Sequence, residues 1–308
     1  MAFKYEQAVP WGRSFDEYWR MFGLTDEDLS RTILGCADGP ASFNAEMSKQ
    51  GHRVVSCDPL YQFSTDQISQ RIDATYENVI NQTRRNQEKF VWDLIPSLDD
   101  LGRVRLAAMH DFLGDYERGK ADGRYLPAQL PDLPFANLSF DLVLCSHFLF
   151  LYSDSFSLAF HQQAVDELCR VAGDVRIFPL LTYNGDPCSF VTPMMNHLKE
   201  AGRLASIEKV PYEFQRGGNM MMRILSRNGG KPRCGIETLR HRSASVHSRL
   251  RLAARESGDP RKTEGRAAWS GESVSFCTDG LAAIYLICST ALNLRDLRPE
   301  RHPNAIPR

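Results

Sequence analysis

The sequence lacks the signatures of a metal protein or a disulfide scaffold. None of its eight cysteines forms a Cys-x-x-Cys pair, and no cluster of cysteine and histidine has the spacing of a zinc site. Several cysteines lie inside apolar runs: Cys57 follows Val-Val-Ser, and Cys145 follows Leu-Val-Leu. Such positions are typical of buried free thiols. The sequence therefore predicts no metal site, and it predicts a reducing, cytoplasmic compartment.

Long apolar runs and an excess of one charge are also missing. The longest apolar run, Gly280–Leu294, has 15 residues, whereas a helix needs about 20 to cross a bilayer. The first 20 residues lack the apolar centre of a signal peptide. The net charge is −1, from 37 basic and 38 acidic side chains. We therefore expect no membrane partner and no clear nucleic-acid partner.

The charge is unevenly divided along the chain. Residues 228–308 carry 14 Lys and Arg against 8 Asp and Glu, whereas residues 1–227 carry 23 against 30. The C-terminal stretch is also rich in Arg, Ser and Gly and shows weak periodicity. We expect one folded domain over 1–227 and a basic, largely disordered tail over 228–308. A poorly formed appendage, or sequence not selected together with the domain, are the alternatives for that tail.

The first 227 residues alternate between apolar runs and helix-like segments, which is typical of a doubly wound α/β fold. Expected strands cover 32–34, 53–57, 124–127, 140–146, 174–181, 205–212 and 220–227, and expected helices begin at Ser14 and Thr25 and cover 41–51, 160–172 and 193–202. The last two strands flank a turn at Gly217-Gly218, which favours an antiparallel hairpin. The sequence thus predicts seven strands in a mostly parallel sheet with an antiparallel edge hairpin.

Residues 64–122 interrupt this alternation. They are polar and helix-prone, with apolar side chains at helical spacing. We expect two or three helices inserted before the third strand. Two roles stay open for them: ordinary packing helices, or a cap over a substrate pocket.

Two features at the ends of the first two strands point to a ligand site. The first strand leads into Gly35-Cys36-Ala37-Asp38-Gly39, where glycine lets the backbone approach a ligand and the following helix directs its N–H groups to the same place. Asp58 closes the second strand, 19 residues after Gly39. A carboxylate at that position can accept both hydrogen bonds of a ribose diol. A turn or helix-capping aspartate is the alternative.

A nicotinamide dinucleotide is the natural competitor for such a site. Its binding motif is Gly-x-Gly-x-x-Gly, whose last glycine allows close packing of helix on strand. Here Ala37 takes the middle position and Ser42 takes the last. The sequence therefore favours a different adenosyl ligand, and a nucleotide-dependent oxidoreductase is the weaker hypothesis.

Four segments together resemble the class I S-adenosylmethionine (SAM) dependent methyltransferases: ILGCADGPASF, VVSCDP, LPFANLSFDLVLCSHFLFLYSD and VDELCRVAGDVRIFPLL. The resemblance covers residues 32–227. It implies a Rossmann-like fold, SAM as cofactor and methyl transfer to a small-molecule acceptor. Residue by residue, it implies that Gly35, Cys36, Asp38 and Gly39 line the methionine end of SAM. It further implies that Asp58 holds the ribose and that Ser146 and His147 lie beside the cofactor.

The sequence departs from this family in three places. Ile33 stands where an acid usually precedes the first glycine by two positions, and Ala37 replaces the middle glycine. The acid often found after the third strand has no clear counterpart, with Gln129 and Asp132 the nearest polar residues. These departures support an alternative function, a non-catalytic module that binds SAM or a nucleotide at a weakened site.

Catalytic residues are not evident, because methyl transfer depends largely on alignment and needs a base only for a protonated nucleophile. His147, Tyr152 and His161 are expected near the pocket, where packing or cofactor contact is the alternative to proton transfer. Trp92 and Tyr18 could cover the cofactor, with core packing as the alternative. The sequence assigns no catalytic base.

Overall fold

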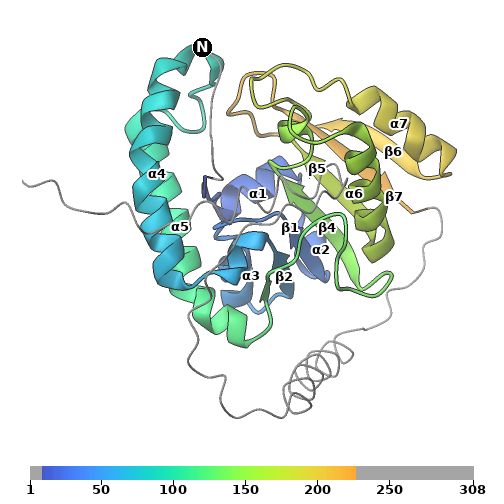
Figure 1. Ribbon diagram of the computed structural model, residues 1–308, viewed down its shortest axis with the longest axis horizontal. Coiled ribbons are helices and arrows are strands. Elements are labelled where there is room, and N and C mark those ends of the chain that lie inside the picture. The colour runs from blue at the N-terminus through green and yellow to red at the C-terminus, as the bar shows by residue number, and fades with distance from the viewer. Residues whose placement is uncertain (1–8, 227–308) are drawn as a thin grey trace, which may run out of the picture.

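A computed structural model describes residues 9–226 of the 308-residue chain. Seven strands form one sheet in the order β3-β2-β1-β4-β5-β7-β6, with helices on both faces (Figure 1). The strands are β1 (Ile33–Cys36), β2 (Val54–Cys57), β3 (Tyr125–Leu126), β4 (Phe140–Ser146), β5 (Ala172–Phe178), β6 (Leu204–Lys209) and β7 (Met220–Leu225). The predicted doubly wound α/β architecture is confirmed.

Seven α-helices and three short 3₁₀ turns accompany the sheet within residues 9–226. The helices are α1 (Phe15–Met21), α2 (Asp26–Leu29), α3 (Phe43–Lys49), α4 (Thr65–Arg85), α5 (Leu98–Ala121), α6 (Leu158–Val171) and α7 (Val191–Glu200), and the 3₁₀ turns are η1 (Pro59–Gln62), η2 (Gln87–Lys89) and η3 (Phe150–Tyr152). Ser14 and Thr25 cap α1 and α2 as expected, each accepting a hydrogen bond from the third backbone N–H of its helix.

The strands match the sequence prediction except at their ends. The apolar run Phe140–Ser146 forms β4 without a change of bounds, because it is buried between two parallel neighbours, β1 and β5. By contrast, β5 ends at Phe178 and β6 at Lys209, earlier than expected. Pro179 and Pro211 follow shortly after these ends, and proline cannot donate to the ladder.

The hairpin at the end of the sheet is antiparallel, as predicted. β7 runs antiparallel to both β5 and β6, so that β6 forms the outer edge. Leu204 and Ile207 of β6 are exposed, whereas Met222 and Ile224 of β7 are buried in the core.

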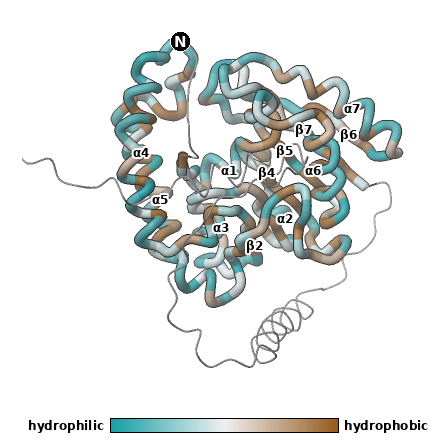
Figure 2. The backbone as a smooth tube through the Cα atoms, in the orientation of Figure 1, coloured by the Kyte–Doolittle hydropathy of each residue, from teal (hydrophilic) through white to brown (hydrophobic). Residues whose placement is uncertain are grey.

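Side chains alternate along each strand and build one core on each face of the sheet. Ile33 and Leu142 point to the side of α1, α2 and α3, while Leu34 and Val143 point to the side of α6 and α7. Figure 2 shows hydrophobic residues concentrated around the sheet, and largely hydrophilic residues on the outward side of α4. This two-sided burial fixes where the carboxyl ends of β1, β2 and β4 meet.

Residues 64–122 form the two long helices α4 and α5, which lie side by side at one flank of the sheet (Figure 1). α5 packs on α3 and on β3. Their shared core is aromatic, with Tyr61, Phe112, Tyr116 and Tyr125 in mutual ring contact. The insertion predicted before the third strand is therefore confirmed.

No helix within residues 9–226 is long and apolar enough to cross a membrane. The run Gly280–Leu294 and the predicted basic tail, residues 228–308, lie outside the described residues.

A chain ending at Arg227 is expected to fold by itself, because the seven-stranded sheet and the three core clusters are built from residues before Arg227. We expect its urea unfolding midpoint, followed by circular dichroism, to match that of the full chain. A shortened chain that is insoluble while the full chain is soluble would place residues 228–308 in the core and contradict the predicted boundary.

Candidate functional site

The bend after β1 is held by its own side chains. Ala37 and Gly39 both have positive φ, 57° and 53°, a region that costs an alanine more than a glycine. Gly35 is needed for a different reason: a Cβ there would lie 1.9 Å from Oδ2 of Asp38. The first glycine of the bend therefore makes room for the Asp38 carboxylate, which packs over it.

Asp38 points inward, and both of its oxygens accept hydrogen bonds from the protein. Oδ1 accepts from the Tyr18 hydroxyl at 2.7 Å, and Oδ2 accepts from Ser56 Oγ at 2.6 Å. Burial, with a smaller contribution from the Asp58 charge, raises the pKa of Asp38 to about 6, although the two hydroxyl hydrogen bonds oppose this shift. Asp38 is thus a structural carboxyl group at the pocket wall.

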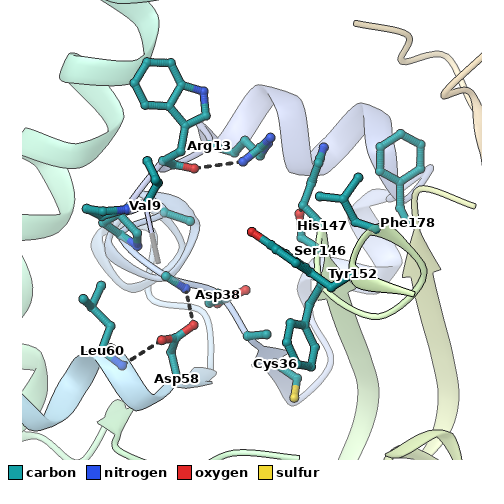
Figure 3. A pocket seen from close by; sticks show the side chains of 18 of the residues that line it. Val9, Arg13, Cys36, Asp38, Asp58, Leu60, Ser146, His147, Tyr152 and Phe178 are labelled. Carbon is teal, nitrogen blue, oxygen red and sulfur yellow. Dashed lines mark hydrogen bonds between the residues drawn. The ribbon is translucent and has the colours of Figure 1, made fainter. Parts of the chain in front are cut away.

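Asp58 lies directly against the bend. Its Oδ2 accepts a hydrogen bond from the Gly39 N–H at 2.9 Å, and its Oδ1 accepts from the Leu60 N–H at 2.8 Å, which caps η1 (Figure 3). Burial raises the pKa of Asp58, and the two backbone N–H groups act in the opposite direction. Asp58 therefore does cap a turn, which was the alternative role. Each of its oxygens still has a lone pair that can accept a further hydrogen bond.

The bend and Asp58 border one pocket of about 440 Å³, a volume within the range of small-molecule sites. Six of the seven residues that the sequence analysis placed at the cofactor line this pocket: Cys36, Asp38, Gly39, Asp58, Ser146 and His147. Ala37 lines it as well. Gly35 lies beneath Asp38 and is not part of the lining. Figure 3 shows Asp58 and Leu60 on one side of this pocket and His147 on the other.

Ser146 is the last residue of β4, and His147 follows it; both line the pocket. His147 has a positive φ of 51°, and its Nδ1 is 2.8 Å from Ser146 Oγ. Burial, reinforced by the charges of Arg13 and Arg105, lowers the pKa of His147 well below its usual value. The imidazole is therefore neutral at pH 7 and is a weak base.

Cys36 is the middle member of a row of three thiols across adjacent strands. It lies in register with Cys57 of β2 and with Cys145 of β4, and all three are buried. Hydrogen bonds with Cys145 and Cys57, together with burial, raise the pKa of the Cys36 thiol well above its usual value. The five cysteines within residues 9–226 are free thiols, and a protonated Cys36 is a neutral wall rather than a nucleophile.

The inserted helices form a wall of this pocket. Gln67, Ile68, Arg71, Val79 and Thr83 of α4 and Leu101 and Arg105 of α5 line it. Aromatic residues line the remaining wall: Phe63, Phe90, Phe148, Tyr152, Phe156, Phe178, Tyr183, Tyr212 and Phe214. Residues 64–122 therefore form helices that pack on the domain and also border this pocket. Their role as a cap over a substrate stays a prediction.

A buried ion pair, which the sequence analysis missed, joins three distant segments beside the pocket. Arg105 of α5 donates to Glu17 of α1, and the Tyr212 hydroxyl donates to the other Glu17 oxygen at 2.7 Å. Burial alone would raise the pKa of Glu17, but the Arg105 charge and hydrogen bond outweigh it and lower the pKa to about 2. The sequence pattern of the helices could not indicate these contacts, because Glu17 is 88 residues from Arg105 and 195 residues from Tyr212.

Other candidate residues fall into two groups. Gln129, Tyr152 and Tyr18 line the pocket, whereas Asp132 does not. His161 is a fully buried core residue whose ring nitrogens contact two backbone carbonyls. Trp92 does not line the pocket either: it packs on Phe90 and Phe214, and its indole N–H donates to a backbone carbonyl.

Comparison with known proteins gives one sequence relative and several similar structures. No protein-family profile matches the chain. It is 32% identical over 220 residues, 71% of this chain and 96% of the other, to an uncharacterized protein, MJ0045, of Methanocaldococcus jannaschii. Among solved structures, it is similar to magnesium protoporphyrin IX methyltransferase from Synechocystis with bound SAM (8% identity, TM-score 0.36, 65% of this chain and 72% of that one). It is also similar to a SAM-dependent methyltransferase from Aquifex aeolicus (14% identity, TM-score 0.33, 68% and 87%).

Proposed function

We propose that this protein binds SAM and transfers its methyl group to a small-molecule acceptor. The chain belongs to the same family as the uncharacterized protein MJ0045. One observation carries this proposal. The bend after β1 and the carboxylate after β2 are joined by the hydrogen bond from Gly39 N–H to Asp58, and both border the same pocket. This is the arrangement that the resemblance to class I methyltransferases implies for an adenosyl ligand.

The residues at the Asp58 end suit a ribose. An ionised carboxylate offers about four lone-pair sites, and the two backbone hydrogen bonds to Asp58 use two of them. The remaining sites can accept from the two hydroxyls of a ribose. Gln129 and Leu130 line the pocket beyond β3, where a polar amide and an apolar side chain suit an adenine ring.

The residues at the other end suit the methionine part. SAM, when bound, supplies an electrophilic methyl group on a positively charged sulfonium. Because His147 is neutral, it adds no repelling charge beside that group. Cys36 and Ala37 present small, uncharged side chains on the pocket floor.

The protein contributes to such a reaction mainly by position. Holding a nucleophile in line with the methyl group at near-contact distance can supply a large part of the rate, and α4, α5 and the aromatic wall define where an acceptor can lie. With its depressed pKa, His147 is a poor proton acceptor. We therefore expect an acceptor whose nucleophile needs little help from a base.

Asp58→Asn is expected to weaken binding of SAM and of S-adenosylhomocysteine roughly 10- to 150-fold, because a charged hydrogen-bond acceptor contributes about 1.5–3 kcal/mol. Isothermal titration calorimetry measures this directly. Asparagine keeps one oxygen for the Gly39 or Leu60 N–H, so it disturbs the bend less than alanine would.

Asp73→Asn is the matched control for this experiment, since Asp73 is exposed on α4 and does not line the pocket. Its affinity should equal that of the unchanged protein. Circular dichroism verifies that both variants are folded. Equal affinity in Asp58→Asn and Asp73→Asn would remove Asp58 from the cofactor site. Thermal protection by NAD(P), and none by SAM, would instead favour an oxidoreductase.

A second candidate function is a module that binds the cofactor without catalysis. Ile33 is fully buried in the core at the position of the usual acid, and Ala37 adopts the left-handed conformation that suits glycine. The first removes a carboxylate that usually helps to hold the cofactor, and the second replaces a glycine that the bend favours. Binding of S-adenosylhomocysteine without its formation from SAM, across a panel of acceptors, would favour this second function.

A further inference from the structure

The pocket is lined by acids at one place and by arginines at another. Its acids, Asp38 and Asp58, lie at the bend and accept hydrogen bonds from the protein itself. Three arginines also line it: Arg13 before α1, Arg71 on α4 and Arg105 on α5. Arginine side chains stay protonated in proteins, so all three carry a positive charge. The charges of Arg13 and Arg105 are close enough to act on each other and on His147.

Arg105 has unused hydrogen-bond donors at the pocket. It is fully buried, and one terminal nitrogen, Nη1, donates to Glu17. Its Nε and Nη2 atoms have no hydrogen-bond partner among residues 9–226. Buried donors of a charged group are costly to leave unpaired, so these two atoms point to a missing acceptor.

Arg13, whose charge acts on both Glu17 and Arg105, repeats this pattern. Its Nη1 donates to the Trp11 carbonyl at 2.8 Å, while its buried Nε has no partner among the described residues. Burial, followed by the charge of Arg105, lowers the pKa of Arg13. A second cation thus lines the pocket with an unpaired donor.

Glu17 cannot balance both cations. One oxygen accepts from the Tyr212 hydroxyl, and the other accepts from the Ser14 backbone N–H and from Arg105. One carboxylate therefore faces two guanidiniums, and His147 is neutral. The cluster keeps one positive charge in excess, in a place where a buried charge needs an anionic partner.

The rest of that wall is apolar. Phe178 and Tyr212 lie in edge contact beside the cluster, and Phe148, Phe156 and Phe214 continue the aromatic lining. From this combination we propose that the methyl acceptor is an apolar or aromatic acid, whose carboxylate or phosphate group is received by Arg13 and Arg105. This inference rests on the proposed methyl transfer and adds the class of acceptor to it.

The same anion chemistry could come from the carboxylate of the cofactor's own methionine part. The position of Arg105 favours the acceptor. Arg105 belongs to the inserted helix α5 and shares Glu17 with Tyr212, which follows β6. Within residues 9–226, it has no hydrogen bond to the bend after β1 or to Asp58, where the cofactor is expected. The experiment therefore has one arm for each source.

The acceptor arm uses the full chain saturated with S-adenosylhomocysteine. Fluorine NMR compares the affinities of two anionic probes, 4-fluorobenzoate and 4-fluorophenyl phosphate, with that of neutral 4-fluorobenzamide. At least one anion should bind about tenfold or more tightly than the amide, and Arg13→Gln should remove most of that preference while leaving the amide unchanged. Arg20→Gln is the matched control, because Arg20 lies on the surface of α1 and pairs with Asp16.

Loss of Arg105 alone would leave Glu17 buried without its partner, so the second variant changes both residues. Glu17→Gln with Arg105→Gln keeps a neutral polar pair at the same place and should lose the preference for anions as well. A double variant that is folded by circular dichroism and keeps the full preference would overturn the role of Arg105.

The cofactor arm compares S-adenosylhomocysteine with 5′-methylthioadenosine, which lacks the amino-acid part. Arg13→Gln should weaken both equally or not at all. If it weakens only S-adenosylhomocysteine and leaves the fluorinated anions unaffected, the cluster serves the cofactor and the acceptor assignment is wrong. Binding of S-adenosylhomocysteine without any preference for the anionic probes overturns this inference alone. Failure of the unchanged protein to bind S-adenosylhomocysteine overturns the proposed function itself.

Discussion

Replacing Glu17 by glutamine is expected to destabilise the protein by about 3–5 kcal/mol, the usual cost of breaking a buried ion pair. Glu17 and Arg105 are both buried, at 5% and 0% exposure. The variant removes the carboxylate that pairs with Arg105, whose charge also acts on Arg13. It also weakens the cap on α1, where Glu17 accepts from the Ser14 N–H. Urea unfolding at pH 7, followed by circular dichroism, measures the change.

The control is Asp16→Asn on the same helix. Asp16 is 68% exposed in its side chain and pairs with Arg20 at the surface, so its replacement should cost less than about 1 kcal/mol. The pH dependence gives a second check. Because the folded-state pKa of Glu17 is lowered to about 2, its contribution is full above its ordinary pKa and is lost as pH falls toward 2. The difference between the unchanged protein and Glu17→Gln should shrink over that range; a constant difference would show that the charge of Glu17 is not the cause.

For Asp38→Asn, we expect the effect on stability and its dependence on pH to have the opposite sign. Burial raises the folded-state pKa of Asp38 from 3.8 to about 6, so the folded protein holds a proton that the unfolded chain releases near pH 4. The protein therefore loses stability relative to the variant as pH rises from about 4 to 6, and the loss levels off above pH 6. The two pKa values predict a relative change of about 3 kcal/mol in favour of asparagine. Asparagine can accept from Tyr18 and donate to Ser56, which keeps both contacts.

Urea unfolding of both proteins between pH 4 and 7.5 tests this prediction, since groups that titrate equally in the two proteins cancel in the difference. A difference that stays constant with pH would show that Asp38 is ionised throughout that range. A variant that becomes less stable as pH rises would show that the Asp38 charge is stabilised by groups other than the two hydroxyls.

The sheet could be predicted from sequence because its signals are local. The continuous apolar run Phe140–Ser146 forms β4 as expected, and the turn at Gly217-Gly218 joins the antiparallel pair. Asp58 was found in a similar way, from its place at the end of the second strand and its spacing of 19 residues from Gly39. The resemblance to class I methyltransferases then supplied the expected roles of the residues at the strand ends.

The rest depends on contacts between distant segments. Asp38 was expected at the cofactor, and it lies at the pocket, but nothing in its neighbours shows that Tyr18 and Ser56 occupy its oxygens. The helices of residues 64–122 were expected from their periodicity, whereas the direction in which Arg105 points depends on how α5 packs against α1. A buried arginine on an amphipathic helix has the same sequence pattern as an exposed one, so its position followed only from the fold.

The Glu17–Arg105 pair also decides how a ligand can reach the site. Moving α5 away from the domain would separate this pair and cost several kcal/mol. We therefore expect α5 to stay in place when a ligand enters. Two residues that line the pocket are exposed to solvent, Tyr152 in η3 and Ser155 just after it. The route from solvent to the site is therefore expected to pass the aromatic ring of Tyr152, where the first selection between flat and bulky molecules would take place.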